Sequence, residues 1–272
     1  MKSIFNNAPS YFPNFTLIKT KLSLYFCVVF LFFINIKLNS QVNVRDSSIN
    51  TFFISAHYAA MLPGGDMKDR FGWNNNLGGS FSFKSKHNLI AGLDFNFIFG
   101  NKIKEDTILD IIKNSKGYVI DGDGIYANIN MFERGFYTAA KLGYIIPFFG
   151  PNPNSGIIIS ASAGFLQHKI RIEHTDNTAP QLRDDYLKGY DRLTNGLAIS
   201  QFVGYAYFGN SRLMSFFAGI EFIEAWTESR RTYDFDRMGA DKTKRFDLIK
   251  GVKVGWIFPL YRRASKSGYY YF

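Results

Sequence analysis

Alternation of bulky apolar residues with small or polar ones, repeated along most of the chain, constrains its fold most. In the segment NLIAGLDFNFIFG, every second position from Leu89 to Phe99 is apolar, and Gly92, Asp94 and Asn96 lie between these positions. A period of two is that of a β-strand, whose successive side chains point to opposite faces. The pattern predicts strands with one bulky apolar face and one face of glycine, serine and charged residues.

The alternation recurs often enough to build a closed sheet. We predict eight strands, at about 50–61, 76–84, 88–99, 135–148, 156–167, 196–208, 213–226 and 251–261. Their connectors alternate between short stretches of turn residues and long polar segments. The long connectors are expected at about 62–75, 100–132, 168–195 and 228–245. Short turns at one end and long loops at the other are typical of transmembrane β-barrels.

Composition supports the same fold class. Aromatic residues make up 18% of the chain, yet its mean hydropathy is only −0.10. A soluble sandwich or lipocalin-like barrel has the same period, but it turns its apolar face inward. Glycines recur at mid-strand on the small face, which fits the narrow lumen of eight strands better than an exterior. The sequence predicts an all-β, eight-stranded antiparallel transmembrane β-barrel with short periplasmic turns and long extracellular loops.

The first 40 residues have the features of a secretory signal peptide. Three lysines precede the apolar run from Leu22 to Ile36, and small polar residues follow it. We expect cleavage near Ser40; the alternative is a retained membrane anchor, for which the apolar run is short. The one cysteine, Cys27, lies inside this run and lacks the context of a lipoprotein signal, so we expect neither a disulfide nor lipidation.

The charge of the chain gives no reason to expect nucleic acid as a partner. The formal net charge is +10, and removing the four basic residues of segment 1–40 leaves +6. An exported chain meets no genome, and no reading motif is present. Contact with anionic lipid headgroups, or solvated loops, explains a modest basic excess.

With these features the chain resembles the small outer-membrane β-barrel proteins of Gram-negative bacteria, a class whose transmembrane domain is like that of OmpA. The resemblance covers about residues 48–272, is architectural, and includes no functional motif. It implies that a closing strand with a terminal aromatic is recognised by the barrel-assembly machinery. Two candidates for this assembly signal compete: Trp256 with Phe258, and Tyr270 with Phe272.

The two candidates lead to a division of the mature chain. We expect the barrel to occupy residues 41–261 and a basic, aromatic tail to occupy 262–272, in the periplasm or at the membrane interface. The alternative is that a bend at Gly268 lets the last residues pair as a strand.

Four charged residues fall on the inward face of their strands. They are Asp94, Lys141, Glu221 and Lys253. Because a buried charge is costly unless it has a partner, we predict a network of ion pairs that plugs the lumen. The alternative is a path for protons or ions.

Ser55 and His57 resemble part of the catalytic triad of an outer-membrane lipid A deacylase. The alternation places both in the lumen, however, and such an enzyme meets lipid at its outer wall. We therefore expect His57 to be hydrogen-bonded to Asp94 or Glu221.

The loops hold two further patterns. The DGDG sequence at 121–124 lacks the later ligands of an EF-hand and predicts a tight turn. Acidic residues and one histidine in the last two long loops could be arranged as in outer-membrane aspartyl-type proteases, although such enzymes have ten strands. Interleaved Arg, Asp and Tyr is more typical of a recognition surface or of contact with lipopolysaccharide. The residues concerned are His174, Asp184, Asp185, Asp234 and Asp236.

The sequence thus predicts a non-enzymatic protein of the cell outer membrane. Its expected role is structural or accessory, with extracellular loops that bind a partner protein or a surface glycan. The alternatives are a lipid A-modifying enzyme and a narrow ion or solute pore. Expected partners are the barrel-assembly machinery during biogenesis, outer-membrane lipid including lipopolysaccharide, and a protein of an outer-membrane complex; no cofactor or metal is expected.

Overall fold

The computed structural model describes residues 47–174, 179–209 and 214–260. The chain divides into two compact units, Met1–Gln41 and Val42–Phe272, and the described residues all belong to the second. The expected signal peptide and the expected tail at 262–272 lie outside the described residues.

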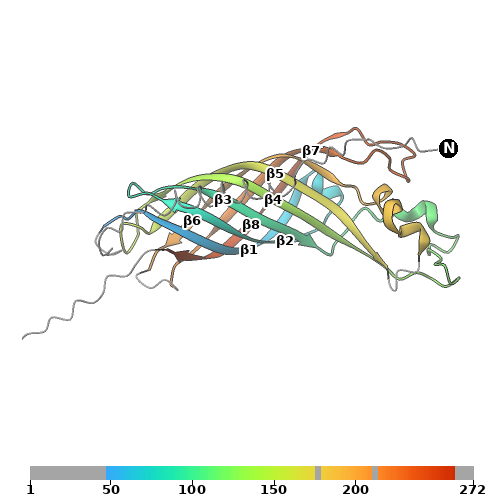
Figure 1. Cartoon of the computed structure of the whole chain (residues 1–272), viewed down its shortest axis with the longest axis horizontal. Helices are drawn as coiled ribbons and strands as arrows, with labels where there is room; N and C mark the ends of the chain where they lie inside the picture. Colours follow the sequence, from blue (N-terminus) through green and yellow to red (C-terminus); the bar gives the residue numbers. More distant parts are fainter. Residues whose placement is uncertain (1–46, 175–178, 210–213, 261–272) are drawn as a thin grey trace, which may run out of the picture. The chain divides into compact units, whose positions relative to one another are not determined.

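Eight antiparallel strands close into a barrel (Figure 1). Each strand pairs with its neighbour in sequence, and β1 pairs with β8 from Phe53↔Pro259 to Gly65↔Asp247. This confirms the predicted eight-stranded antiparallel barrel. The strands are β1 (Thr51–Gly65), β2 (Asn74–Lys84), β3 (Leu89–Gly100), β4 (Ile129–Ile146), β5 (Gly156–His174), β6 (Thr194–Tyr207), β7 (Phe216–Ser229) and β8 (Lys244–Pro259).

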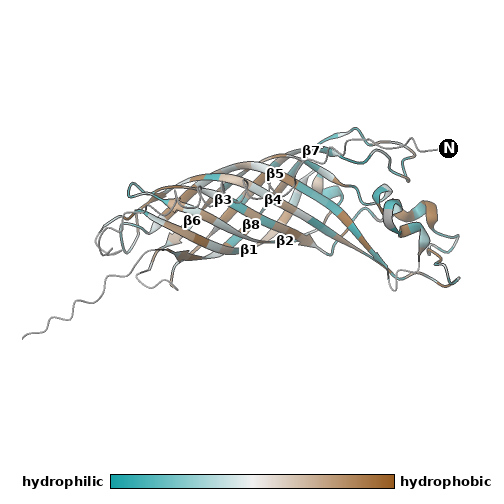
Figure 2. Ribbon diagram, in the orientation of Figure 1, coloured by the Kyte–Doolittle hydropathy of each residue, from teal (hydrophilic) through white to brown (hydrophobic). Residues whose placement is uncertain are grey.

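The barrel wall is apolar outside and polar inside. Along β1, buried and exposed residues alternate strictly for twelve positions. Outward residues include Leu142 and Leu197, whose exposed fractions are 70% and 73%, while Asp94 and Glu221 are buried. Figure 2 shows apolar residues along all the labelled strands of the wall. This is the inverse of a soluble barrel, so the alternative of a soluble sandwich or lipocalin-like fold is wrong.

Three of the four connectors at one end are longer than all those at the other end, as predicted, but the bounds differ. One end has 85–88, 147–155 and 208–215, and the other has 66–73, 101–128, 175–193 and 230–243, which we call the long connectors. The first of these, 66–73, is no longer than 208–215, so the expectation of a long connector at about 62–75 is wrong. The predicted long connectors were too long because several strands continue past the apolar pattern. For example, β4 and β5 stay paired up to Ile129↔His174. Ladder hydrogen bonds are made by the backbone, so pairing can continue where side chains no longer alternate.

The long connectors contain the only helical turns among the described residues. They are the 3₁₀ segments η1 (Met67–Asp69), η2 (Asp106–Ile112), η4 (Pro180–Leu182) and η5 (Asp184–Gly189). No helix in the described part of the chain is long and apolar enough to cross a membrane.

Candidate functional site

The four charges predicted to face inward form two ion pairs in the lumen. Lys141 Nζ lies 2.8 Å from Asp94 Oδ1, between the adjacent strands β4 and β3. Lys253 Nζ lies 2.9 Å from Glu221 Oε1, between β8 and β7. All four residues line one cavity, so the fold brings both pairs to the same level of the barrel. Each buried charge has an opposite charge beside it, which offsets part of the cost of desolvation.

A chain of hydroxyl groups extends from one of these pairs across the lumen. Ser200 Oγ donates to Glu221 Oε1 at 3.4 Å, and Ser162 Oγ lies 2.9 Å from Ser200 Oγ. Tyr137 Oη follows at 2.8 Å from Ser162 Oγ. The cavity left beside these groups has a free volume of about 40 Å³. Since one water needs about 10–15 Å³ of such volume, the cavity has room for only a few waters.

Ser55 and His57 face the lumen, as the alternation predicts, but they do not form a catalytic pair. Ser55 Oγ is 2.7 Å from Ser80 Oγ, and His57 Nε2 is 2.5 Å from Asn96 Oδ1. The expectation that His57 bonds a carboxylate, Asp94 or Glu221, is therefore wrong. The reason lies in register: His57, Gly78 and Asn96 are aligned across three strands, and the glycine leaves the path open.

The short-turn end of the lumen is filled by its own apolar and polar groups. Phe53 packs edge-on against Phe208 with ring centroids 5.8 Å apart, and Ile49 belongs to the same buried cluster. Lys84 is fully buried here, and its Nζ donates to Asn154 Oδ1 at 2.9 Å and to Ser48 Oγ at 3.2 Å. This end of the barrel is closed by side chains from β1, β2 and two turns.

At the opposite end the long connectors fold together over the barrel. We call this assembly, made of the described parts of 66–73, 101–128, 175–193 and 230–243, the long-loop cap. Its apolar centre is continuous with the upper lumen and includes residues from η1, η2, η4 and the strands below. Among the buried members are Met67, Phe71, Ile108, Leu109, Leu182 and Tyr190. The cap therefore shares a packed core with the upper lumen, and most surface loops lack such packing.

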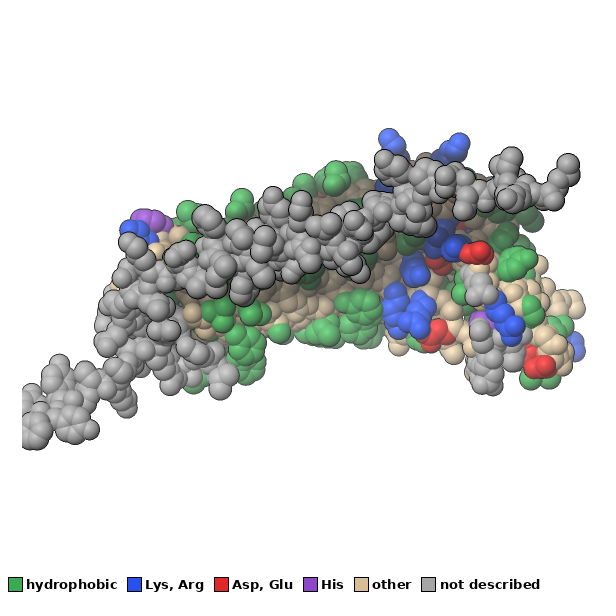
Figure 3. All heavy atoms as spheres, viewed as in Figure 1, with side chains coloured by type: hydrophobic (Ala, Val, Ile, Leu, Met, Phe, Trp, Pro, Cys, Tyr) green, Lys and Arg blue, Asp and Glu red, His purple; other side chains and the backbone are tan. Residues whose placement is uncertain are grey.

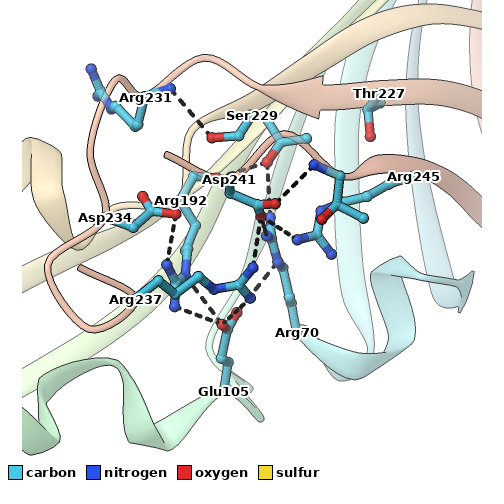
Figure 4. A network of polar contacts seen from close by, with 12 residues as sticks. Arg70, Glu105, Arg192, Thr227, Ser229, Arg231, Asp234, Arg237, Asp241 and Arg245 are labelled. Carbon is cyan, nitrogen blue, oxygen red and sulfur yellow. Dashed lines mark hydrogen bonds and ion pairs between the residues drawn. The ribbon is translucent and has the colours of Figure 1, made fainter. Parts of the chain in front are cut away.

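Arg192 is the central ionic group of the cap (Figure 4). Only 2% of the residue is exposed. Its guanidinium lies 3.0 Å from Glu105 Oε1, 2.9 Å from Asp234 Oδ2 and 2.5 Å from Asp236 Oδ2. The carboxylates come from the second and fourth long connectors, so one side chain ties three loops together. Charge-assisted hydrogen bonds of this kind are stronger than neutral ones.

Arg70 is a second buried arginine in the same network. Its Nη1 donates to Thr194 Oγ1 at 2.8 Å, and its Nε lies 3.3 Å from Glu105 Oε2. Asp241 lies 3.7 Å from its Nη2 and also binds Arg245 at 2.5 Å. Glu105 thus lies between two arginines, and Arg70 joins the first long connector directly to the second and the fourth and to the first residue of β6.

The electrostatics of the cap reflect burial and close charges. Burial raises the pKa of Asp234 although Arg192 opposes the rise. Burial also disfavours the charged form of Asp241, but hydrogen bonds from Thr243 and Arg245 outweigh it and hold the pKa of that carboxyl below its ordinary value. Desolvation lowers the pKa of Arg70, with the nearby charge of Arg245 adding to the effect. Desolvation acts the same way on Arg192, yet its carboxylate partners raise its pKa.

The loop residues considered for catalysis are not gathered into one site. His174 Nε2 is 3.2 Å from the backbone oxygen of Leu182, and Asp185 pairs with Lys188 at 2.5 Å. Asp234 and Asp236 both bind Arg192, and the side chain of Asp184 lies outside the description. An aspartyl-type arrangement with His174 is therefore not formed by the described side chains.

The DGDG segment is a tight turn, as predicted. Asp121 Oδ1 accepts hydrogen bonds from the backbone N–H groups of Asp123 and Ile125, at 2.9 Å and 3.0 Å. Gly124 has a φ of +80°. Within the described residues, no group of three or more His, Cys, Asp or Glu side chains is placed to hold a metal ion.

Of the proposed assembly signal, only one half is described. Trp256 and Phe258 face outward on β8, with exposed fractions of 53% and 39%. Tyr270 and Phe272 lie outside the described residues.

Sequence reasoning missed the most connected residues of the cap, Arg70, Glu105 and Arg192. None belongs to an alternating segment or a known motif. The usable signal was the density of Arg and Asp in the last two long connectors, which indicated a recognition surface but not internal ion pairs. A buried network between loops far apart in sequence leaves no local periodicity.

No family model and no curated protein matches this chain. Several solved structures are similar to it. The outer membrane protein OprG from Pseudomonas aeruginosa is 10% identical, with a TM-score of 0.41, over 79% of this chain and 99% of that one. Neisserial surface protein A is 10% identical, with a TM-score of 0.38, over 76% of this chain and 94% of that one.

Ail, the attachment invasion locus protein of Yersinia pestis, is 11% identical, with a TM-score of 0.37, over 76% of this chain and 99% of that one. The solved structures thus fall in the class expected from the sequence, small outer-membrane β-barrels. Because these TM-scores are low, the assignment of the fold rests on the strand pairing described above and not on these similarities.

Proposed function

We propose that this chain is a non-enzymatic outer-membrane β-barrel whose long-loop cap binds a partner protein at the cell surface. The membrane location is supported by the apolar exterior. Large side chains such as Phe95, Leu142 and Leu197 are at least 60% exposed, and the outward faces of all eight strands carry similar residues. A soluble protein rarely exposes so large an apolar surface, whereas a transmembrane barrel places such a surface against the hydrocarbon core of the membrane.

Orientation follows from the connectors. In outer-membrane barrels the short turns are periplasmic and the long loops extracellular. The long-loop cap then faces the outside of the cell. On this proposal the chain is exported with the help of segment 1–40 and inserted by the barrel-assembly machinery.

The observation that carries the binding function is the internal order of the cap. Arg192 and Arg70 hold the long connectors together through buried ion pairs, over a packed core. A surface already held in one conformation loses less entropy when a partner binds. A barrel that needed loops only to close its end would gain little from so much buried charge.

A hairpin of the second long connector supplies the candidate contact surface. Bridges between Lys113 and Val119 and between Ile120 and Tyr126 form it. Tyr118 and Tyr126 stack with ring centroids 4.6 Å apart, and each is 53% exposed. Ile125 is 64% exposed beside them. Exposed aliphatic and aromatic side chains on a loop that faces water gain from burial against a protein, and isoleucine has no special affinity for sugars.

The alternatives find less support. An enzyme acting on lipid needs Ser55 and His57 at the outer wall, and both are buried in the lumen. A pore needs a continuous path, but side chains fill the barrel at the short-turn end and the cap covers the other. We expect no stepwise conductance from the purified protein in planar bilayers.

Site-specific photocrosslinking in intact cells tests the proposal. A photoreactive phenylalanine analogue replaces Tyr118 in the hairpin or, as the control, Phe149, which is 81% exposed in a short turn at the other end. We expect a discrete protein adduct from position 118 and none of the same mass from position 149. The adduct should disappear when Ile120 and Ile125 are changed to Ser.

Three results would contradict the proposal. A missing adduct at position 118, in a barrel that still shifts on a gel when boiled, would argue against a protein partner. Binding to purified surface glycan instead would support the glycan alternative. A chain that fails to shift on boiling and fails to fractionate with outer membranes would overturn the membrane location.

A further inference from the structure

Three basic side chains stand together on the outer wall of the barrel, next to the cap. Arg134 on β4 and Lys169 on β5 are direct partners in the strand register, and Arg171 is paired with Phe132 two positions further. The side chains of Lys169 and Arg171 are 44% and 56% exposed. We call these three residues the outer-wall basic cluster. Figure 3 shows Lys and Arg side chains gathered next to the apolar surface at the end where the long loops lie.

Placing like charges directly opposite one another on two strands is unfavourable. Such pairs destabilise a sheet. Arg134 and Lys169 nevertheless occupy one register position on the same face of the wall. An anion beside the two cations would offset this repulsion.

The described part of the chain supplies that anion only in part. Arg171 lies 2.7 Å from Glu173, but Lys169 reaches Asp191 only at 3.9 Å. Asp191 already binds Arg231 through both of its oxygens. Arg134 has no carboxylate within ion-pair distance among the described residues. It donates instead to the backbone oxygen of Glu133 at 2.7 Å.

The position of the cluster on the wall indicates where its ligand lies. Phe136 is the next outward residue of β4 after Arg134. Its ring packs against that of Phe165 on β5, with centroids 6.1 Å apart. On the other side Phe132 lies under the guanidinium of Arg134, 5.1 Å from its carbon. Basic groups flanked by aromatic rings at the edge of an apolar belt lie at the level of lipid headgroups.

We infer that the outer-wall basic cluster binds the phosphate groups of a phosphorylated glycolipid headgroup in the leaflet at the long-loop end. Arginine matches a phosphate with two parallel N–H donors, and lysine adds a point charge. Three cations on two neighbouring strands fit a headgroup that carries more than one phosphate. The inference rests on the membrane location proposed above, and it concerns the barrel wall rather than the partner surface of the cap.

Binding of bis-phosphorylated lipid A disaccharide to the detergent-solubilised barrel, measured by native mass spectrometry, tests the inference. The test variant is Arg134→Gln/Lys169→Gln/Arg171→Gln. The matched control is Lys116→Gln/Lys188→Gln/Lys242→Gln, which removes the same charge from exposed positions of the long-loop cap. A gel shift on boiling checks that each variant is folded.

We expect the test variant to bind the lipid roughly 100-fold more weakly, from about fivefold for each basic side chain near an anionic surface. The control should change affinity by less than about threefold. For dephosphorylated lipid, the affinities of the wild-type barrel and of the two variants should differ from one another by less than about threefold. Excess inorganic phosphate should leave lipid binding largely intact, since the lipid adds its acyl chains.

Other outcomes would overturn the inference. Equal losses of lipid affinity in the test and control variants would show that the lipid is bound by general electrostatic attraction and not by the outer-wall basic cluster. Complete displacement by inorganic phosphate would identify a free-anion site instead of a lipid site. A folded barrel that inserts into phosphatidylcholine vesicles but does not discriminate phosphorylated lipid would remove this site and leave the proposed function standing, whereas failure to insert would overturn both.

Discussion

His57 Nε2 lies 2.5 Å from Asn96 Oδ1, across a strand that contributes only Gly78 between them. A Cβ on Gly78 would stand 2.6 Å from His57 Nε2 and 2.7 Å from Asn96 Oδ1. The hydrogen bond therefore exists because the middle strand has no side chain at that position. Small residues in the lumen do more than fit a narrow barrel: they let polar groups two strands apart meet.

Gly78→Ala should lower the free energy of unfolding in lipid vesicles by about 1–3 kcal/mol, since overpacking and the loss of one buried hydrogen bond act together. Urea titration followed by tryptophan fluorescence measures it. Gly79→Ala is the control, because its Cβ would face outward and meet only Ser55 O, at 3.0 Å. Equal effects of the two substitutions would show that His57 and Asn96 are not coupled through this gap.

The ion pair of Lys253 and Glu221 should behave as a buried pair. Lys253→Met or Glu221→Gln alone leaves one charge without its partner, and we expect each to cost about 3–5 kcal/mol of unfolding free energy. The double variant should cost less than the sum of the two. A double-mutant cycle by urea titration measures the difference, and strictly additive losses would argue against direct coupling.

Arg192→Gln should loosen the long-loop cap without unfolding the barrel. The change leaves Glu105, Asp234 and Asp236 close together with no central cation. We expect chymotrypsin to cleave the cap about tenfold faster or more, as for a local opening made easier by about 1.4 kcal/mol or more. The shift on boiling should persist.

Arg230→Gln provides the control for that experiment. Arg230 pairs with Glu228 at 2.6 Å, but both side chains are nearly half exposed. A pair of this kind contributes about 0–1 kcal/mol. Similar cleavage of the two variants would show that burial of Arg192 adds nothing to the order of the cap.

Acid should weaken the cap through Asp241. Hydrogen bonds from Thr243 and Arg245 hold the pKa of its carboxyl below its ordinary value in the folded state. The unfolded cap therefore binds more protons than the folded one below about pH 4, so this contribution is present above that pH and is lost as the pH falls.

Fluorescence quenching can follow this titration. In a Trp226→Phe/Trp256→Phe background, acrylamide reports on Trp73, which belongs to the cap and lies under the ammonium group of Lys102. We expect quenching to increase as the pH falls below about 4, and Asp241→Asn to show higher quenching at neutral pH with a weaker change in acid. An identical acid response in Asp241→Asn would assign the effect to another group.

The sequence by itself determined the barrel wall. Alternation at positions such as Leu93 and Asp94 is a local property, because each residue of a strand faces opposite to the next, so strand number, inward and outward faces and the inward charges could all be predicted. It also predicted that Asp94, Lys141, Glu221 and Lys253 face the lumen, though not which pairs would form.

Only the tertiary structure decided the partner of His57 and the order of the cap. The first depends on the register of three strands, which aligns His57, Gly78 and Asn96. The second depends on contacts such as that between Arg192 and Glu105, which are 87 residues apart in the chain. Neither the partner of His57 nor the ion pairs of the cap produce a periodic pattern in the sequence, because both depend on residues that come close together only when the barrel closes.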